Sequence, residues 1–182
     1  MNASASAPVA MMRALVRPGT AQVASWGLIA AALAVVQALV LAGVNAQAGH
    51  LSAGRVGICV VVALTAGLYA GFGRLIAVRR PALAIGWLLG ATGLVLALSV
   101  LTEQYALYGL ATAPGTLPGT WLAGWLSGTL TALTLVLVAL LVLLFPDGRL
   151  PSRRWRPVLW AIAVVLTGVV MVGAPYWPFA MT

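Results

Sequence analysis

The feature that most constrains this chain is a series of long apolar runs separated by short breaks. A helix that crosses the hydrocarbon core of a bilayer needs about 20 apolar residues, because unpaired backbone groups are costly in lipid. Of the 182 residues 63% are hydrophobic, and the ten basic and two acidic side chains are too few to cover a water-soluble surface. The sequence therefore predicts an all-α fold, a polytopic transmembrane helical bundle.

Five runs are long enough to be spans. We expect residues 1–20 to form a cytoplasmic N-terminal segment and residues 21–182 to form a single transmembrane helical domain. The expected spans cover about residues 24–44, 56–78, 82–101, 121–145 and 158–174.

The arginines indicate which breaks lie on the same side of the membrane. Short loops rich in Arg or Lys stay in the cytoplasm. If five helices alternate, only Arg55 falls on the outer side, together with His50 and Glu103. We therefore expect the N-terminus inside and the C-terminus outside, in a multi-pass protein of the plasma membrane. The arginines on the inner side are Arg13, Arg17, Arg74, Arg79, Arg80, Arg149, Arg153, Arg154 and Arg156.

The net charge of +8 raises the question of nucleic acid as a partner. A nucleic-acid site gathers its basic residues on one face of a soluble domain. Here they are spread over breaks between apolar runs, so we expect the partner to be a bilayer with anionic headgroups and no nucleic acid.

The first run has a second interpretation. Arg13 and Arg17 precede it and Ala46-Gln47-Ala48 follows it, a pattern that also occurs in secretory signal peptides with a cleavage site. The apolar part of a signal peptide has about 7–15 residues, and this run is longer. A retained helix is therefore favoured, and a mature protein starting at Gly49 would show cleavage.

The outer side carries one titratable group of residues. Arg55 opens the second span and Glu103 closes the third, so an ion pair between these helix ends is allowed, with His50 nearby. The favoured interpretation is an interfacial salt bridge. The alternative is a site that senses pH, a metal ion or an external ligand, since histidine titrates near neutrality.

Two kinds of residue predict contacts between helices. Gln37 is strongly polar and lies well inside the first span, where an interhelical hydrogen bond is favoured over a ligand contact. Glycines four residues apart let two helices approach closely, and such faces would also serve a homodimer. The glycine pairs are Gly67 with Gly71, Gly86 with Gly90, and Gly124 with Gly128.

The break at residues 145–156 combines a turn with four arginines. Pro-Asp-Gly cannot continue a helix, and Asp147 can cap its own turn. Arginines beside such a turn bind anionic lipid headgroups. The predicted turn and headgroup contacts are Asp147, Arg149, Arg153, Arg154 and Arg156.

Residues 145–157, Phe-Pro-Asp-Gly-Arg-Leu-Pro-Ser-Arg-Arg-Trp-Arg-Pro, together with residues 79–81, 85–89 and 105–106, resemble the membrane region of bacterial two-component sensor histidine kinases. The resemblance covers about residues 70–160. It implies a sensory or anchoring module that signals by helix movement, as a homodimer. The chain departs from the family at Leu83-Ala84, where Asn-Pro is common.

The kinase half of that family is absent from the sequence. It has no phosphoacceptor histidine in a cytoplasmic helix and no glycine-rich ATP-binding lid. We therefore expect no catalytic residue, no cofactor and no metal site, and a chain that is not an enzyme by itself. The alternatives are a small transporter or permease subunit, which would need charged residues at mid-membrane, and a structural membrane protein.

Overall fold

The computed structural model describes residues 18–144 together with Val164 and Gly168. Within residues 18–144 the regular structure is helical, which confirms the all-α prediction for that part of the chain. The elements are α2 (Pro18–Gln47), α3 (Ala53–Arg79), α4 (Ala84–Leu107), the π-helix η1 (Tyr108–Thr112) and α5 (Thr120–Leu144).

Four segments in this region are long and apolar enough to cross a membrane. They are Ala21–Gln47, Ala53–Arg79, Ala84–Thr112 and Thr120–Leu144, and they correspond to the first four predicted spans. The fifth predicted span, at residues 158–174, lies outside the described residues except for Val164 and Gly168. The count of five and the orientation therefore stay predictions. The predicted lipid-headgroup contacts Asp147, Arg149, Arg153, Arg154 and Arg156 also lie outside the described residues.

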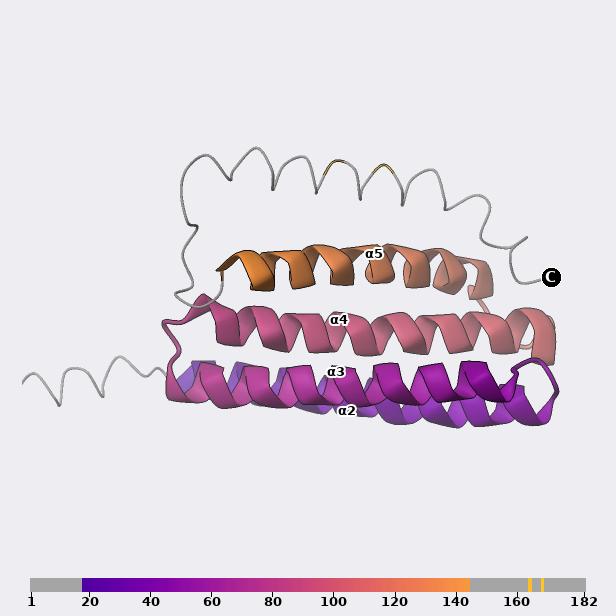
Figure 1. The fold of residues 1–182 in the computed structure, drawn as a ribbon. Helices are drawn as coiled ribbons and strands as arrows, with labels where there is room; N and C mark the ends of the chain where they lie inside the picture. The colour runs from indigo at the N-terminus through magenta and orange to yellow at the C-terminus, as the bar shows by residue number, and fades with distance from the viewer. Residues whose placement is uncertain (1–17, 145–163, 165–167, 169–182) are drawn as a thin grey trace, which may run out of the picture.

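The helices run up and down, with α4 between the α2–α3 pair and α5 (Figure 1). Helix α4 contacts each of the other three long helices, and α2 contacts α3. Within the described residues, α5 contacts α4 and η1 but neither α2 nor α3. We call the end of the bundle that holds the α3–α4 turn the Arg79 end, and the opposite end the Glu103 end.

Helices α2, α3 and α4 pack through faces of small residues. On α3 a buried residue recurs every third or fourth position, which keeps it on one side of the helix. The central cluster is made of alanines from all three helices, and larger side chains such as Leu94 pack around it. The backbones therefore approach closely, which is how helices gain packing energy where no hydrophobic effect operates. The buried α3 residues are Cys59, Ala63, Ala66, Ala70, Gly73 and Ala77.

The closest approach joins α3 to α4 at glycines. A Cβ atom added to Gly73 would overlap the backbone of Gly90, and one added to Gly93 would overlap that of Ala70. The prediction that Gly86 and Gly90 lie at a helix contact is thus confirmed, since Gly90 meets Gly73 and a Cβ on Gly86 would lie 2.8 Å from the Ala77 nitrogen.

The glycine pair on α3 behaves differently. A Cβ added to Gly67 or Gly71 would meet no atom within 4 Å. This pair therefore makes no close helix contact within the described chain, although its spacing is the same as that of Gly86 and Gly90. A homodimer through such faces stays a prediction.

Helix α4 extends past the expected end of the third span. The expected end was about residue 101, but α4 continues to Leu107 and η1 carries the helix to Thr112. Hydropathy marks this segment as a break because it contains Glu103 and Gln104. The helix persists because the buried Gln104 is hydrogen-bonded to Asn45 of α2.

Candidate functional site

The candidate site is a group of buried polar side chains at the Glu103 end, which we call the polar cluster. It consists of Asn45 from α2, Cys59 from α3, Gln104 from α4 and Thr112 from η1. Each of the first three lies on the buried face of its helix, toward the Glu103 end. Asn45 and Gln104 are both 0% exposed.

Hydrogen bonds join the four side chains across three helices. The Asn45 amide nitrogen donates to the backbone carbonyl of Gln104 at 3.1 Å and to its side-chain oxygen at 3.2 Å. The Gln104 amide donates to the Cys59 sulfur at 3.4 Å. Because buried amides without partners are costly, these bonds fix how α2, α3 and α4 are rotated and staggered at this end.

The π-helix brings Thr112 into the cluster. Its wider turn holds more residues than an α-helical turn, and it closes with a bond of 2.8 Å from the Ala113 backbone nitrogen to the Tyr108 carbonyl. The extra residue returns Thr112 to the face of Gln104. The Thr112 hydroxyl then donates to the Asn45 side-chain oxygen at 2.7 Å. Single π turns inside α-helices are frequent at functional sites.

A tight turn after Asn45 begins the connection between α2 and α3. The Gly49 nitrogen donates to the Ala46 carbonyl and the His50 nitrogen donates to the Asn45 carbonyl, both at 3.0 Å. This pattern is a Schellman motif, and it requires the positive φ of 83° that Gly49 adopts. Asn45 is therefore held through its backbone as well as its side chain.

The predicted outer residues lie at the same end as the polar cluster. His50 is exposed in the α2–α3 turn, Arg55 is exposed in the first turn of α3, and Glu103 is exposed next to Gln104 on α4. The charge of Arg55 is close enough to act on Glu103. No direct ion pair joins them within the described chain, so the favoured interfacial salt bridge is absent from this structure and the sensing interpretation stays a hypothesis.

Metal binding has no support in the described part of the chain. Among those residues, no three His, Cys, Asp or Glu side chains are placed to hold one ion. The cysteine, Cys59, is buried and bonded to Gln104. The polar cluster consists of two amides, a hydroxyl and a thiol, so its groups are suited to holding helices in register rather than to moving protons.

The predicted interhelical hydrogen bond of Gln37 is not seen among residues 18–144 and stays a prediction. Gln37 is exposed on α2, and within the described chain it makes no interhelical hydrogen bond. It lines an open groove of about 640 Å³ between α2, α4 and α5, which exists because α2 and α5 do not touch. The buried interhelical hydrogen bonds of this helix are made by Asn45, which lies beyond the predicted end of the first span.

No protein-family model, no curated protein and no solved structure matches this chain. The resemblance to the membrane region of sensor histidine kinases therefore stays a prediction. The fold and the polar cluster define a class. Within residues 18–144, four helices are suited to crossing a membrane, and buried polar side chains join three of them at the Glu103 end.

Proposed function

We propose that this chain is a membrane-embedded sensory or anchoring module without catalysis. A change at the Glu103 end alters how the helices sit relative to one another, and this movement is the signal. The observation that supports the proposal most is the polar cluster, because its buried side chains join α2, α3 and α4 at the Glu103 end. At the Arg79 end, the side-chain bond between helices within the described chain is the exposed one from Arg74 to Ser25.

Away from the polar cluster, the interface among α2, α3 and α4 is suited to small movements. Its central residues are alanines such as Ala34, Ala66 and Ala97, which have no long side chains to interlock. Helices that meet through such faces can shift by about 1–2 Å, the range of helix shifts in known switches. The hydrogen bonds of the polar cluster then set the resting positions of the three helices, and a change in these bonds lets the helices shift.

The arginine distribution and the family resemblance supply the direction of the signal. We place the Glu103 end outside the plasma membrane, with His50, Arg55 and Glu103 as the receiving group, and the Arg79 end in the cytoplasm. A homodimer and a separate cytoplasmic kinase would complete the pathway. A transporter gains less support, since the charged side chains of the described helices lie near helix ends.

The orientation predicts the sidedness of three positions. Reporter fusions at Thr116, Ser152 and Thr182 should be outside, inside and outside, respectively, because each successive position follows one further crossing. Paired alkaline phosphatase and fluorescent-protein fusions in intact cells measure this directly. An outside reporter at Ser152 would contradict both the five-span count and the proposed direction of signalling.

If the two ends of the bundle are coupled, Thr112→Val at the Glu103 end should move the helices at the Arg79 end. This change removes the hydroxyl bond to Asn45 and keeps the side-chain shape. We expect the mean distance between spin labels at Gln22→Cys on α2 and Ala84→Cys on α4, both exposed and at the Arg79 end, to shift by about 1–2 Å. Pulsed electron paramagnetic resonance on the full chain in vesicles measures it, with Cys59 kept because it is buried and belongs to the polar cluster.

Thr102→Val is the matched control for this experiment. It makes the same chemical change on the same helix, but the Thr102 hydroxyl bonds only to carbonyls of its own helix. The control should leave the distance unchanged. If Thr112→Val moves labels at the Glu103 end and leaves those at the Arg79 end in place, the sensory role is contradicted and an anchor remains.

A further inference from the structure

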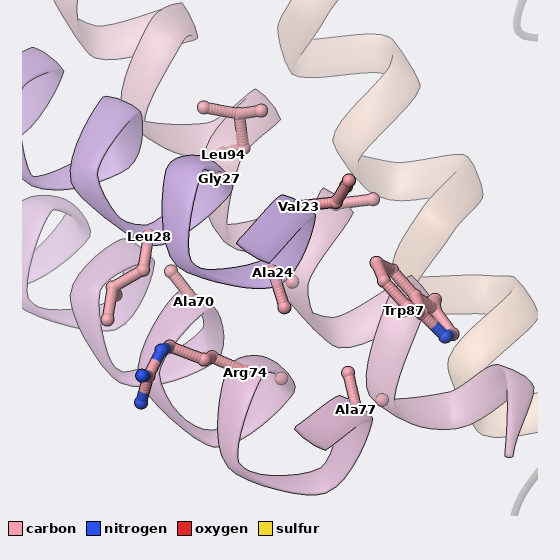
Figure 2. Close-up of a pocket in the computed structure, with 13 residues that line it drawn as sticks. Val23, Ala24, Gly27, Leu28, Ala70, Arg74, Ala77, Trp87 and Leu94 are labelled. Carbon is pink, nitrogen blue, oxygen red and sulfur yellow. The ribbon is translucent and has the colours of Figure 1, made fainter. Parts of the chain in front are cut away.

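A cavity of about 190 Å³ lies between α2, α3 and α4 near the Arg79 end (Figure 2). Its wall is formed by apolar and small residues, among them Gly27 and Leu28 of α2, Ala77 of α3, and Trp87 of α4. The one charged residue that lines it is Arg74 of α3. The cavity is therefore an apolar space with a single cation at its border.

The glycines of the helix faces create this space. Gly27, Gly73, Gly86 and Gly90 all line the cavity, and space remains at Gly27 and Gly90, whereas a backbone neighbour lies against Gly73 and Gly86. A Cβ added to Gly27 would meet no atom within 4 Å. Room for a larger group therefore exists beside α2, whereas at Gly73 the α4 backbone already fills the space.

Arg74 is fixed in position at the cavity. Its Nε donates to the Ser25 hydroxyl at 3.2 Å, and Ser25 donates in turn to the Ala21 carbonyl at 2.8 Å. In Figure 2 the side chain extends from α3 alongside Leu28 and Ala70. The bond to Ser25 leaves the terminal nitrogens of the exposed guanidinium directed at the surroundings of the bundle.

The charge at this end has no counterpart within the described chain. Arg74 lies five residues before Arg79, or about 7.5 Å along the helix axis, so it sits below the helix end. Arg79 and Arg80 add two exposed cations. The acidic residue of the described chain, Glu103, is at the opposite end. A guanidinium at this depth in a bilayer calls for an anion, and the anion that a bilayer supplies is a lipid phosphate.

We propose that this cavity binds an acyl chain of an anionic phospholipid whose phosphate contacts Arg74. The volume is below the 300–1,000 Å³ or so of pockets that hold whole small ligands, which fits part of a slim chain. The inference is separate from the sensory proposal and holds whichever side of the membrane the Arg79 end faces.

Trp87 provides a reporter inside the site. The full chain is placed in phosphatidylcholine vesicles containing a small fraction of phosphatidylglycerol with brominated acyl chains, since bromine quenches nearby tryptophan. Subtracting the signal of a Trp87→Phe variant isolates Trp87 from the other tryptophans. We expect brominated phosphatidylglycerol to quench Trp87 about five-fold more effectively than brominated phosphatidylcholine, the ratio for one arginine near anionic lipid.

Two variants with matched controls test the two halves of the site. Arg74→Gln should reduce the lipid preference to nearly one, while Arg79→Gln, which removes the same charge outside the cavity lining, should keep most of it. Gly27→Leu should fill the cavity and halve the quenching or more. Gly67→Leu makes the same change in open space on α3 and should leave the quenching intact.

Four results would overturn the proposal. Equal quenching by the two brominated lipids would mean that no anionic headgroup is selected. Equal losses in Arg74→Gln and Arg79→Gln would mean diffuse attraction to the bilayer surface. Full quenching in folded Gly27→Leu would mean that the acyl chain lies elsewhere, and absence of Trp87 quenching by either lipid would mean that a segment of this chain or a second copy covers the cavity.

Discussion

The Gly93→Leu variant is expected to lose most of its folded bundle. A Cβ at this position would lie 2.7 Å from the Ala66 carbonyl oxygen and would overlap the backbone of Ala70, so neither contact can yield by rotating a side chain. Helices α3 and α4 must then separate along their central contact. Overpacking costs about 1–3 kcal/mol where side chains can adjust, and we expect at least 3 kcal/mol here.

Unfolding of the full chain in bicelles, titrated with sodium dodecyl sulfate and followed by tryptophan fluorescence, measures this loss. Gly67→Leu is the control, since it makes the same change in a helix at a position with open space around it. The control should lie within about 0.5 kcal/mol of the parent chain. A Gly93→Leu variant as stable as Gly67→Leu would mean that α3 and α4 do not pack as described.

The second large effect is expected for Asn45→Leu, with a loss of about 2 kcal/mol in the free energy of unfolding. Leucine has nearly the same size but leaves the two Gln104 oxygens without the Asn45 donor and the Thr112 hydroxyl without its acceptor. A buried polar group left unpaired costs about 1–3 kcal/mol. The same titration measures this change.

Gln37→Leu is the control for Asn45→Leu. It also replaces an amide by a hydrocarbon side chain, but it breaks no hydrogen bond within the described chain. It removes an exposed amide from the same helix, and we expect no loss of stability. The double variant Asn45→Leu/Gln104→Leu should cost less than the sum of the two single changes, because each single change already breaks the bond between the two side chains. Additive costs would show that Asn45 and Gln104 do not interact.

The helices themselves could be predicted from apolar length. The second expected span, residues 56–78, matches Ala53–Arg79 within three residues at either end. Here the apolar run and the arginines at the far end indicate the same boundary, and in the structure the Ser52 hydroxyl caps the other end by accepting from the Arg55 nitrogen. The end of the third helix could not be predicted in this way, because the helix continues through Glu103 and Gln104. Gln104 is buried there by its contact with Asn45, which lies nearly 60 positions earlier in the chain.

Asn45 was missed although the sequence carried a signal for it. The buried positions of α2 are Ala31, Ala34, Ala38 and Ala42, and the same spacing of three or four residues leads next to Asn45. Gln37 lies off this face. A search for polar residues inside the expected span finds Gln37, whereas extending the alanine face finds Asn45.

Glycine spacing alone did not identify the contacts. Gly67 with Gly71 and Gly86 with Gly90 have equal separations, but only the second pair meets another helix. Spacing shows that two residues share a face, and it contains no information on which face a neighbour covers. The α3 contact instead uses Gly73, which lies on the face of Ala66 and Ala70.

The contacts of α5 bear on how the protein is made. Because α2, α3 and α4 are consecutive and contact one another, their shared interface and the Asn45–Gln104 bonds can form while the ribosome is still translating α5. Helix α5 then packs against α4, on one side of the three helices that have already assembled. Membrane insertion of this chain would therefore proceed in two stages, with a self-sufficient first half and a later, separately docked addition.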